Sequence, residues 1–241
     1  MWNLWQMGKI IERKNQMLNV LYEDNHVIVV VKEPNIPSQA DKTGDEDMLT
    51  IVKKYIKEKY NKPGDVYLGL VHRLDRPVGG VMVFARTSKA ASRLSEEVRN
   101  KTFSKKYLAI VNGKMEKESS TFNDYMWKDE KKNTSYVVKE GKKNAKLASL
   151  DYEVVEYNPK EDLSLVKIDL HTGRHHQIRV QFSSRMHAIY GDNKYHGRGQ
   201  GSGICLWAYE LSFIHPTLKK EMTFTCYPPK KGEWKKFEKI K

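Results

Sequence analysis

Apolar residues occur along most of the chain in short blocks of strand length, and helical spacing is less frequent. The stretch "NVLYEDNHVIVVVKEP" contains two runs rich in β-branched residues on either side of Glu-Asp-Asn, which predicts a β-hairpin. The last strands of the chain are expected to pair around a turn at His215 and Pro216. Further apolar blocks bounded by turn residues predict strands at 66–72, 79–86, 105–113, 147–157, 163–170, 204–213 and 221–227.

Three segments have helical character. Apolar residues keep helical spacing over 48–60, directly after Asp47, which predicts a helix capped by that aspartate. A second helix is expected over 89–100 with Ser88 as its N-cap, and the apolar spacing of 175–186 is compatible with a third.

Many strands, few helices and mostly short connections predict an α+β fold with a mixed, largely antiparallel sheet. Residues 113–146 are polar and rich in lysine, so irregular edge strands and loops are expected there. No apolar run approaches the length of about 18 residues that a membrane span needs, so no membrane association is expected.

The charge of the chain points to a polyanionic partner. Lysine and arginine outnumber aspartate and glutamate by 43 to 30, a net charge of +13, which suits nucleic acid but is also compatible with a merely basic soluble protein. Cys205 and Cys226 lie far apart in apolar runs, so we expect buried thiols in a cytoplasmic protein rather than a zinc site or a disulfide.

One carboxylate occupies an unusual place in the stretch "VHRLDRPVGGVMVFAR". Asp75 lies between Arg73 and Arg76 at a break between two expected strands. Neighbouring cations stabilise a carboxylate in its charged form, in which it can act as nucleophile or base. A structural salt bridge on a surface loop explains the same spacing, so this pattern alone leaves both interpretations open. Gly79 and Gly80 would allow another backbone or a ligand to come close.

Two further segments carry candidate chemistry. Tyr107 follows Lys105 and Lys106 in "SKKYLAI", a combination suited to base stacking and phosphate contact, although a half-buried strand tyrosine looks the same. The stretch "HTGRHHQIRV" crowds three histidines together, but it has no carboxylate or cysteine at metal-ligand spacing. If helical, His175 and His176 would diverge by about 100°. We therefore expect no metal there.

Taken together, these segments resemble the RluA-type family of RNA pseudouridine synthases. The similarity runs from "LYEDNHVIVVVKEPNIPSQ" to "ELSFIHPTLKKEMTFTCYPP". Between them lie "HRLDRPVGGVMVFARTSKAA", "KKYLAIVNGK", "TGRHHQIRVQ" and "YGDNKYHG", in the order of the family. The resemblance implies an α+β pseudouridine synthase fold, with a long, mixed and mostly antiparallel sheet, flanking helices and a central catalytic cleft. The catalytic domain would span 18–229, between an N-terminal extension at 1–17 and a basic C-terminal tail at 230–241.

The resemblance also implies roles for individual residues. Asp75 corresponds to the catalytic aspartate, Tyr107 to the tyrosine that stacks on the target uracil and assists proton removal, and Arg179 to the arginine that pairs with the aspartate. Arg73 corresponds to a residue that helps fill the space left by a flipped base, and Ile178 would wall the pocket. The other expected substrate-binding residues are His72, Arg76, Lys105, Lys106, Arg174 and His176.

The sequence departs from the family pattern at several positions. Many relatives carry a small N-terminal RNA-binding domain, which we expect this chain to lack, so that the body, with the basic tail "KKGEWKKFEKIK", would select the substrate. The substituted positions are Val78-Gly79-Gly80 for the usual Thr-Ser-Gly, His175 for Thr, Gln181 for His, and Trp207 where His is frequent.

The resemblance implies an enzyme that isomerises uridine to pseudouridine in structured RNA, ribosomal or transfer, on a base flipped out of its stack. We expect a monomer that needs no cofactor, in line with the lack of a P-loop or dinucleotide motif. Two other interpretations stay open: an RNA-binding protein on this fold that has lost catalysis, such as an RNA chaperone, and a metal-dependent nuclease that uses the histidines.

Overall fold

The computed structural model describes residues 18–199 and 201–240. The helices are α2 (Met48–Lys59), α3 (Ser88–Asn100) and α4 (Gln177–Ser183), with 3-10 turns η1 (Asn193–Tyr195) and η2 (Gly232–Lys236). The strands are β1 (Val20–Glu23), β2 (Val27–Lys32), β3 (Gly69–Leu70), β4 (Gly79–Ala85), β5 (Ser104–Asn112), β6 (Ser119–Asp129), β7 (Thr134–Val138), β8 (Lys146–Asn158), β9 (Leu163–Leu170), β10 (Leu206–Ile214) and β11 (Glu221–Thr225).

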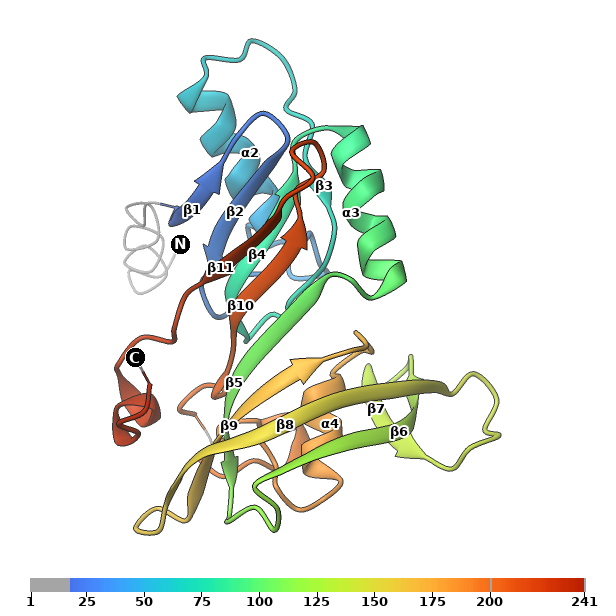
Figure 1. The fold of residues 1–241 in the computed structure, drawn as a ribbon, viewed down its shortest axis with the longest axis vertical. Helices are drawn as coiled ribbons and strands as arrows, with labels where there is room; N and C mark the ends of the chain where they lie inside the picture. Colours follow the sequence, from blue (N-terminus) through green and yellow to red (C-terminus); the bar gives the residue numbers. More distant parts are fainter. Residues whose placement is uncertain (1–17, 200, 241) are drawn as a thin grey trace, which may run out of the picture.

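Within the described residues the strands form one sheet in the order β1-β2-β4-β10-β5-β9-β8-β6-β7, with β11 beside β10 and β3 beside β4 (Figure 1). Strands β4 and β10 are parallel, and the other named pairs are antiparallel. This arrangement confirms the expected α+β fold with a long, mixed and mostly antiparallel sheet. No helix among the described residues is long and apolar enough to cross a membrane.

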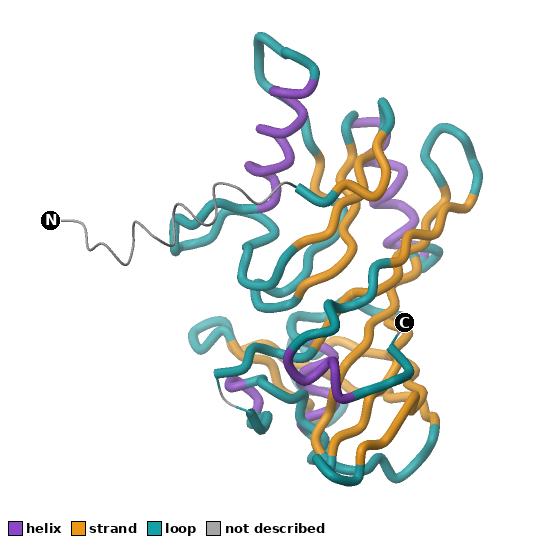
Figure 2. The backbone as a smooth tube through the Cα atoms, turned by 90° about the vertical axis from the view of Figure 1, so that its left-hand side faces the viewer, coloured by secondary structure: helices purple, strands orange, loops and turns teal. Residues whose placement is uncertain are grey.

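The upper part of the sheet is covered by a helix on each face. Side chains alternate between the two faces of a strand, so the fully buried strand β2 needs an apolar partner on both sides. Ile28 and Val30 share a core with residues of α2, whereas Val27 and Val29 share a core with residues of α3. Figure 2 shows the two helices on opposite sides of the upper strands.

Several predicted boundaries need correction. Asp47 does cap α2, since its side chain accepts a hydrogen bond from the Thr50 backbone, but α3 is capped by Thr87 rather than Ser88. The third helix begins at Gln177, so the two preceding histidines lie outside it. The predicted strand at 66–72 is reduced to the two residues of β3, because the chain leaves the sheet to form the loop that carries Asp75.

Residues 113–146 are more regular than expected. They include the long strand β6 and its partner β7, which form an antiparallel hairpin and pack against α4. Lysines occupy mostly exposed positions in this segment, so the apolar residues Phe122 and Met126 can face the core in spite of the polar composition. The polar, lysine-rich composition of this segment made the alternation of buried and exposed residues in β6 hard to recognise in the sequence.

The predicted C-terminal tail packs on the body of the protein. The expected extension at 1–17 lies outside the described residues. In the expected tail, Trp234, Phe237 and Ile240 are buried in a cluster with residues of β5 and β9, and Lys236 pairs with Glu161 at 2.8 Å. The described part of this segment thus packs on the body.

Two of the departures from the family pattern lie against each other. Gly79 of β4 pairs in parallel register with Trp207 of β10. A Cβ atom on Gly79 would overlap the indole ring, with Cε3 only 2.7 Å away. The indole is buried and donates a hydrogen bond to the Cys226 carbonyl at 2.8 Å, so it cannot easily move aside. The large Trp207 therefore occupies space that a serine at position 79 would need.

Gly79→Ser should therefore destabilise the protein by about 1–3 kcal/mol, because it overpacks a filled core. In a chain that also carries Trp207→His, the same change should cost measurably less, because imidazole lacks the six-membered ring whose atoms lie nearest the added Cβ. Urea unfolding of the four proteins measures this coupling. Gly64→Ser, at a site with open space around it, serves as the control and should change stability little. Equal costs of Gly79→Ser in both backgrounds would contradict the steric explanation.

Candidate active site

A cavity of about 490 Å³ opens where three distant segments meet: the loop at 71–78, strand β5, and residues 170–179 around the start of α4. Asp75, Tyr107 and Arg179 come from these three segments, and all three line the cavity. The structure thus brings together the three residues for which the sequence suggested catalytic roles.

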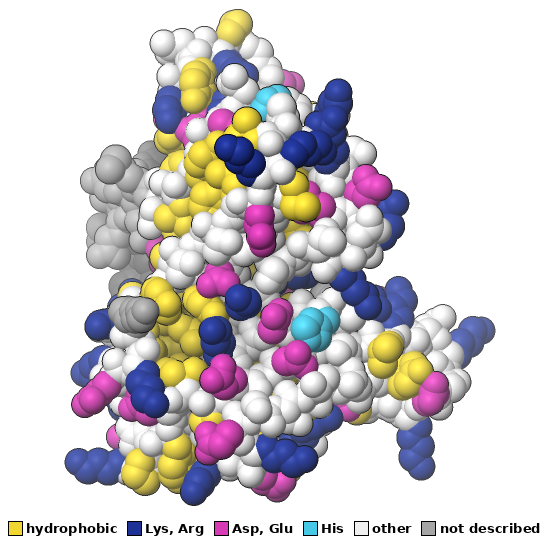
Figure 3. Space-filling view, viewed as in Figure 1, with side chains coloured by type: hydrophobic (Ala, Val, Ile, Leu, Met, Phe, Trp, Pro, Cys, Tyr) yellow, Lys and Arg dark blue, Asp and Glu magenta, His cyan; other side chains and the backbone are white. Residues whose placement is uncertain are grey.

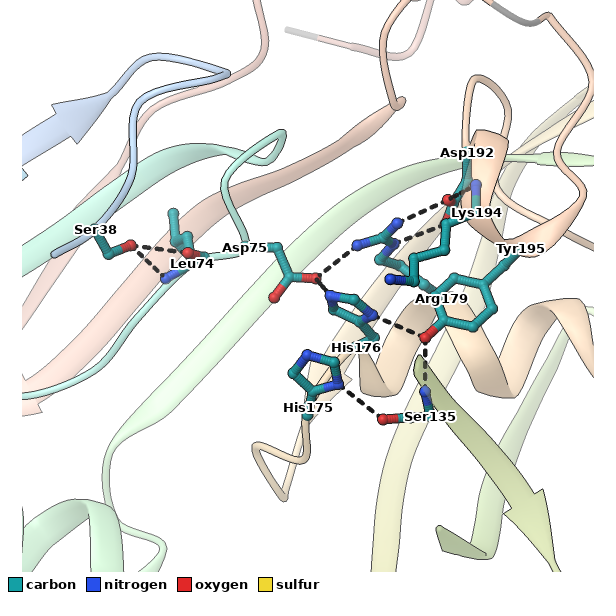
Figure 4. Close-up of polar contacts among 10 residues, drawn as sticks. All are labelled: Ser38, Leu74, Asp75, Ser135, His175, His176, Arg179, Asp192, Lys194 and Tyr195. Atoms are coloured by element: carbon teal, nitrogen blue, oxygen red, sulfur yellow. Dashed lines mark hydrogen bonds and ion pairs between the residues drawn. The ribbon is translucent and has the colours of Figure 1, made fainter. Parts of the chain in front are cut away.

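The loop that carries Asp75 is tied to the body on both sides of the aspartate. The Ser38 hydroxyl donates to the Leu74 carbonyl at 2.8 Å and accepts from the Leu74 amide at 3.1 Å. The Lys32 ammonium donates to the Arg76 carbonyl at 2.9 Å. These bonds fix the backbone before and after Asp75, and its side chain projects from a held position (Figure 4).

Lys32 is unusual because its side chain is completely buried. Burial lowers the pKa of its ammonium to about 7, although the negative charge of Asp75 acts in the opposite direction. The lysine therefore supplies a cation, or at higher pH a neutral amine, beneath the loop that carries Asp75.

Arg179 is buried between two carboxylates. Its Nε and Nη2 atoms donate to the two oxygens of Asp192 at 2.7 and 2.8 Å, and its Nη1 donates to Asp75 Oδ2 at 3.1 Å. The contact between Arg179 and Asp75 is the one the sequence suggested. The bidentate pair with Asp192 fixes the plane of the guanidinium, which in turn fixes the direction of its third bond.

Two stacked histidines complete the surroundings of Asp75 (Figure 4). The rings of His175 and His176 lie with centroids 3.7 Å apart, because both residues precede α4 instead of diverging on it. His176 Nε2 lies 3.7 Å from Asp75 Oδ2, and its Nδ1 lies 2.8 Å from the Tyr195 hydroxyl. Burial, together with the nearby charge of Arg179, lowers the pKa of His176 to about 2, so its ring is neutral at neutral pH.

Tyr107 lies in the wall of the cavity with its residue surface only 6% exposed. Burial, and after it the charge of Asp75, raise the pKa of its hydroxyl above the ordinary value of 10.0. The phenol therefore keeps its proton at neutral pH and presents an uncharged ring to the cavity.

The other predicted substrate-binding residues divide into two groups. Two of them do not line the cavity: Arg76 turns away from Asp75 to pair with Asp41 and Asp45, and Lys106 pairs with Glu210. Strand alternation explains Lys106, which points to the opposite face from its neighbours. The residues that do line the cavity are His72, Arg73, Lys105, Arg174, His176 and Ile178.

His72 lines the cavity, but its ring is uncharged and is held by a hydrogen bond, so it cannot contact a phosphate as a cation. The Val83 amide donates to its Nε2 at 3.2 Å, and its ring packs against Phe103. Burial, and to a smaller extent the charge of Lys105, lower the pKa of His72 to about 3. The side chain is a neutral part of the wall.

Sequence reasoning missed several residues of the site. Lys32, Asp192 and Tyr195 lie in segments that carried the family resemblance, yet no local pattern assigns them a contact. Arg99 and Lys101 at the end of α3 also line the cavity. An odd polar residue at the end of an apolar strand, as in "VVVKEP", is the one signal that could have pointed to Lys32.

The mouth of the cavity is positively charged. Among the described residues, no ion pair to a carboxylate is formed by Arg73, Lys101 or Lys105, whereas cations elsewhere, such as Arg86 and Arg185, are paired. Figure 3 shows lysine and arginine side chains gathered at the notch between α3 and the lower strands. Unpaired cations in a recess attract a polyanion more strongly than paired ones on an open surface.

The sequence profile of RNA pseudouridylate synthase matches residues 26–184, more than half of the chain. The chain belongs to this family. The uncharacterized RNA pseudouridine synthase YhcT of Bacillus subtilis (strain 168) is 33% identical over 204 residues, which cover 83% of this chain and 65% of YhcT. The membership confirms the resemblance noted in the sequence.

Two relatives are named for different RNA substrates. Ribosomal large subunit pseudouridine synthase C of Buchnera aphidicola is 30% identical, with 87% of this chain and 67% of that protein covered. For tRNA pseudouridine synthase C of Haemophilus influenzae the identity is 29%, with 87% and 92% covered. The solved structure of human RNA pseudouridylate synthase domain containing 4 has the same fold, with a TM-score of 0.71, 22% identity and 94% of each chain covered.

Mild acid should destabilise the protein, because the rings of His72 and His176 are buried in their neutral forms. The native pKa values of His72 and His176, about 3 and about 2, lie below the ordinary value of 6.5, so folding excludes protons from both. Their contribution to stability is complete above pH 6.5 and falls as the pH drops below it, by up to about 1.4 kcal/mol per pH unit for each ring.

Urea unfolding of wild type and His72→Gln, between about pH 7.5 and about pH 5, measures this effect. The variant has one titrating ring fewer, so its free energy of unfolding should decrease less steeply with falling pH. Identical slopes for the two proteins would show that His72 is not buried in the neutral form.

Proposed function

We propose that this protein isomerises uridine to pseudouridine within structured RNA, with Asp75 as the catalytic carboxylate. The observation that carries the proposal is the ion pair between Asp75 and the buried Arg179, placed in a cavity beside Tyr107 in a member of the pseudouridylate synthase family. A merely structural salt bridge would not need a recess large enough to admit a nucleobase. Here the carboxylate, 29% exposed, faces such a recess.

The reaction exchanges one bond of the nucleotide for another. The bond between the ribose and a uracil nitrogen breaks, the base turns, and a ring carbon bonds to the same ribose carbon. The proton displaced from that ring carbon leaves, and the freed nitrogen takes up a proton. Electrons and atoms balance within one nucleotide and the surrounding water, so the proposed isomerisation is redox-neutral.

Asp75 would act on the ribose, as a nucleophile at the anomeric carbon or as a base at the neighbouring carbon. Its second oxygen, Oδ1, accepts no hydrogen bond from the described part of the chain, because the bond from Arg179 goes to Oδ2. Tyr107 would stack its neutral ring on the uracil, and its high pKa favours stacking over a role as base before the substrate arrives.

The base must leave its stack to enter the cavity, at a cost of a few kcal/mol. Contacts between RNA phosphates and the unpaired cations at the mouth would offset that cost. Relatives named for ribosomal and for transfer RNA support structured RNA as the substrate class, and the proposal extends to either kind.

The first test replaces Asp75 by asparagine, which has nearly the same shape but cannot act as carboxylate nucleophile or base. We expect Asp75→Asn to fold and to bind RNA, yet to form no pseudouridine in a single-turnover assay. Asp65→Asn, at an exposed aspartate, is the matched control and should retain wild-type activity. Product formation by well-folded Asp75→Asn would disprove the catalytic role.

The second test separates the ring of Tyr107 from its hydroxyl. If the ring stacks on the flipped base, Tyr107→Ala should weaken RNA binding by about 1–3 kcal/mol, whereas Tyr107→Phe should bind as wild type does. A hydroxyl that takes part in proton transfer would make Tyr107→Phe bind normally but react slowly. Binding titrations and single-turnover rates on the same preparations distinguish these outcomes, and full activity of both variants would remove Tyr107 from the site.

A further inference from the structure

The hydrogen bonds around Tyr195 determine where its hydroxyl proton points. The backbone amide of Ser135 donates to the Tyr195 oxygen at 2.9 Å, so the oxygen is an acceptor in that contact. The proton of the hydroxyl then needs an acceptor of its own, and His176 Nδ1 lies 2.8 Å away. Figure 4 shows the chain of contacts from Ser135 through Tyr195 and His176 to Asp75.

The contacts of Tyr195 favour one tautomer of His176. The ring is neutral at neutral pH, so it carries one proton. If the Tyr195 hydroxyl donates to Nδ1, that nitrogen has no proton of its own. The proton is therefore on Nε2, the atom that faces Asp75 Oδ2 at 3.7 Å. The other tautomer would turn a lone pair toward the carboxylate, and it would leave the tyrosine proton without an acceptor among the described residues.

The short turn η1 supports both partners of Asp75 at once. Asp192, directly before the turn, holds Arg179, and Tyr195, three residues later, holds His176. The Tyr195 ring also lies 5.1 Å from the guanidinium of Arg179. On the other side, the stacked His175 is held through its Nδ1 by the Ser135 hydroxyl at 2.8 Å. The stacking on His175 thus holds the orientation of the His176 ring, and the contact with Tyr195 holds its tautomer.

We propose that Tyr195 is a positioning residue for the isomerisation, because its hydroxyl keeps His176 in the Nε2–H form that presents a neutral N–H group to the carboxylate of Asp75. This inference rests on the proposed function of Asp75. A neutral N–H group offers Asp75 a second donor beside Arg179. A charged imidazolium in the same place would be repelled by the guanidinium.

The tautomer can be measured without any assay of activity. Long-range proton–nitrogen correlation spectra of the nitrogen-labelled protein distinguish the two neutral forms of a histidine ring, and the signals of His176 are identified by their loss in His176→Gln. We expect the Nε2–H form in wild type and a mixture of both forms in Tyr195→Phe. A wild-type Nδ1–H form, or an unchanged pattern in Tyr195→Phe, would overturn the proposal.

A double-mutant cycle tests whether the tautomer matters for the reaction. Tyr195→Phe should lower the single-turnover rate about tenfold, as expected for one lost hydrogen bond in the reacting state, with RNA affinity unchanged. In His176→Gln the amide nitrogen can take the place of Nε2 and has no tautomer, so adding Tyr195→Phe should change the rate by less than about twofold. Equal losses in both backgrounds would show a merely structural role.

Tyr152→Phe is the matched control. Tyr152 is equally buried, and its hydroxyl donates to the Lys117 carbonyl at 3.4 Å, away from Asp75. It should leave both the His176 spectrum and the rate unchanged. The two proposals fail in different ways. Product formation by Asp75→Asn would disprove the catalytic role of Asp75. If Asp75→Asn is inactive but the wild-type protein has His176 in the Nδ1–H form, only the role of Tyr195 is disproved.

Discussion

The buried guanidinium of Arg179 joins the parts of the chain that make the pocket. A buried charge is tolerated only when it is paired and hydrogen-bonded, and Arg179 meets this condition through Asp192 and Asp75. Asp192 neutralises the arginine with a bidentate pair, so the third bond of the guanidinium can hold the carboxylate of Asp75, which remains partly exposed. Asp192, which is 2% exposed, thus balances the buried charge, and the side chain of Asp75 stays 29% exposed toward the cavity.

The same division between paired and unpaired charge extends over the surface of the site. Arg76 lies next to Asp75 in sequence, but its pairs with Asp41 and Asp45 hold the loop and remove it from the cavity. Lys101 and Lys105 have no such partner among the described residues and stay available at the mouth. Exposed ion pairs contribute little to stability, so leaving the exposed Lys101 unpaired costs the fold little. Lys105 is more buried, and this burial lowers the pKa of its ammonium. The exposed charge of Lys101 is what an RNA backbone would encounter first.

Sequence patterns predicted most of the strands because burial on one or both faces leaves a visible period of two. They also indicated that Asp75 and Arg179 could meet, through the family resemblance. They failed where a contact depends on the third dimension. Nothing local shows that Lys32 reaches the carbonyl of Arg76, or that Gly79 is small because Trp207 is large. Lys106 lies outside the cavity that Lys105 lines, because successive residues of a strand point to opposite faces.

Burial keeps two groups of the pocket, His176 and Tyr107, from changing their protonation near neutral pH. The pKa of His176 is well below its ordinary value and the pKa of Tyr107 is well above it, since burial disfavours the charged form of each side chain. Lys32 differs, because its pKa of about 7 places its change of charge in the working range of an enzyme. A neutral amine still donates a hydrogen bond, so losing the proton would keep the Arg76 carbonyl in place and hold the loop. What would change is the field at Asp75, which makes Lys32 a group that can alter the charge balance of the site without altering its geometry.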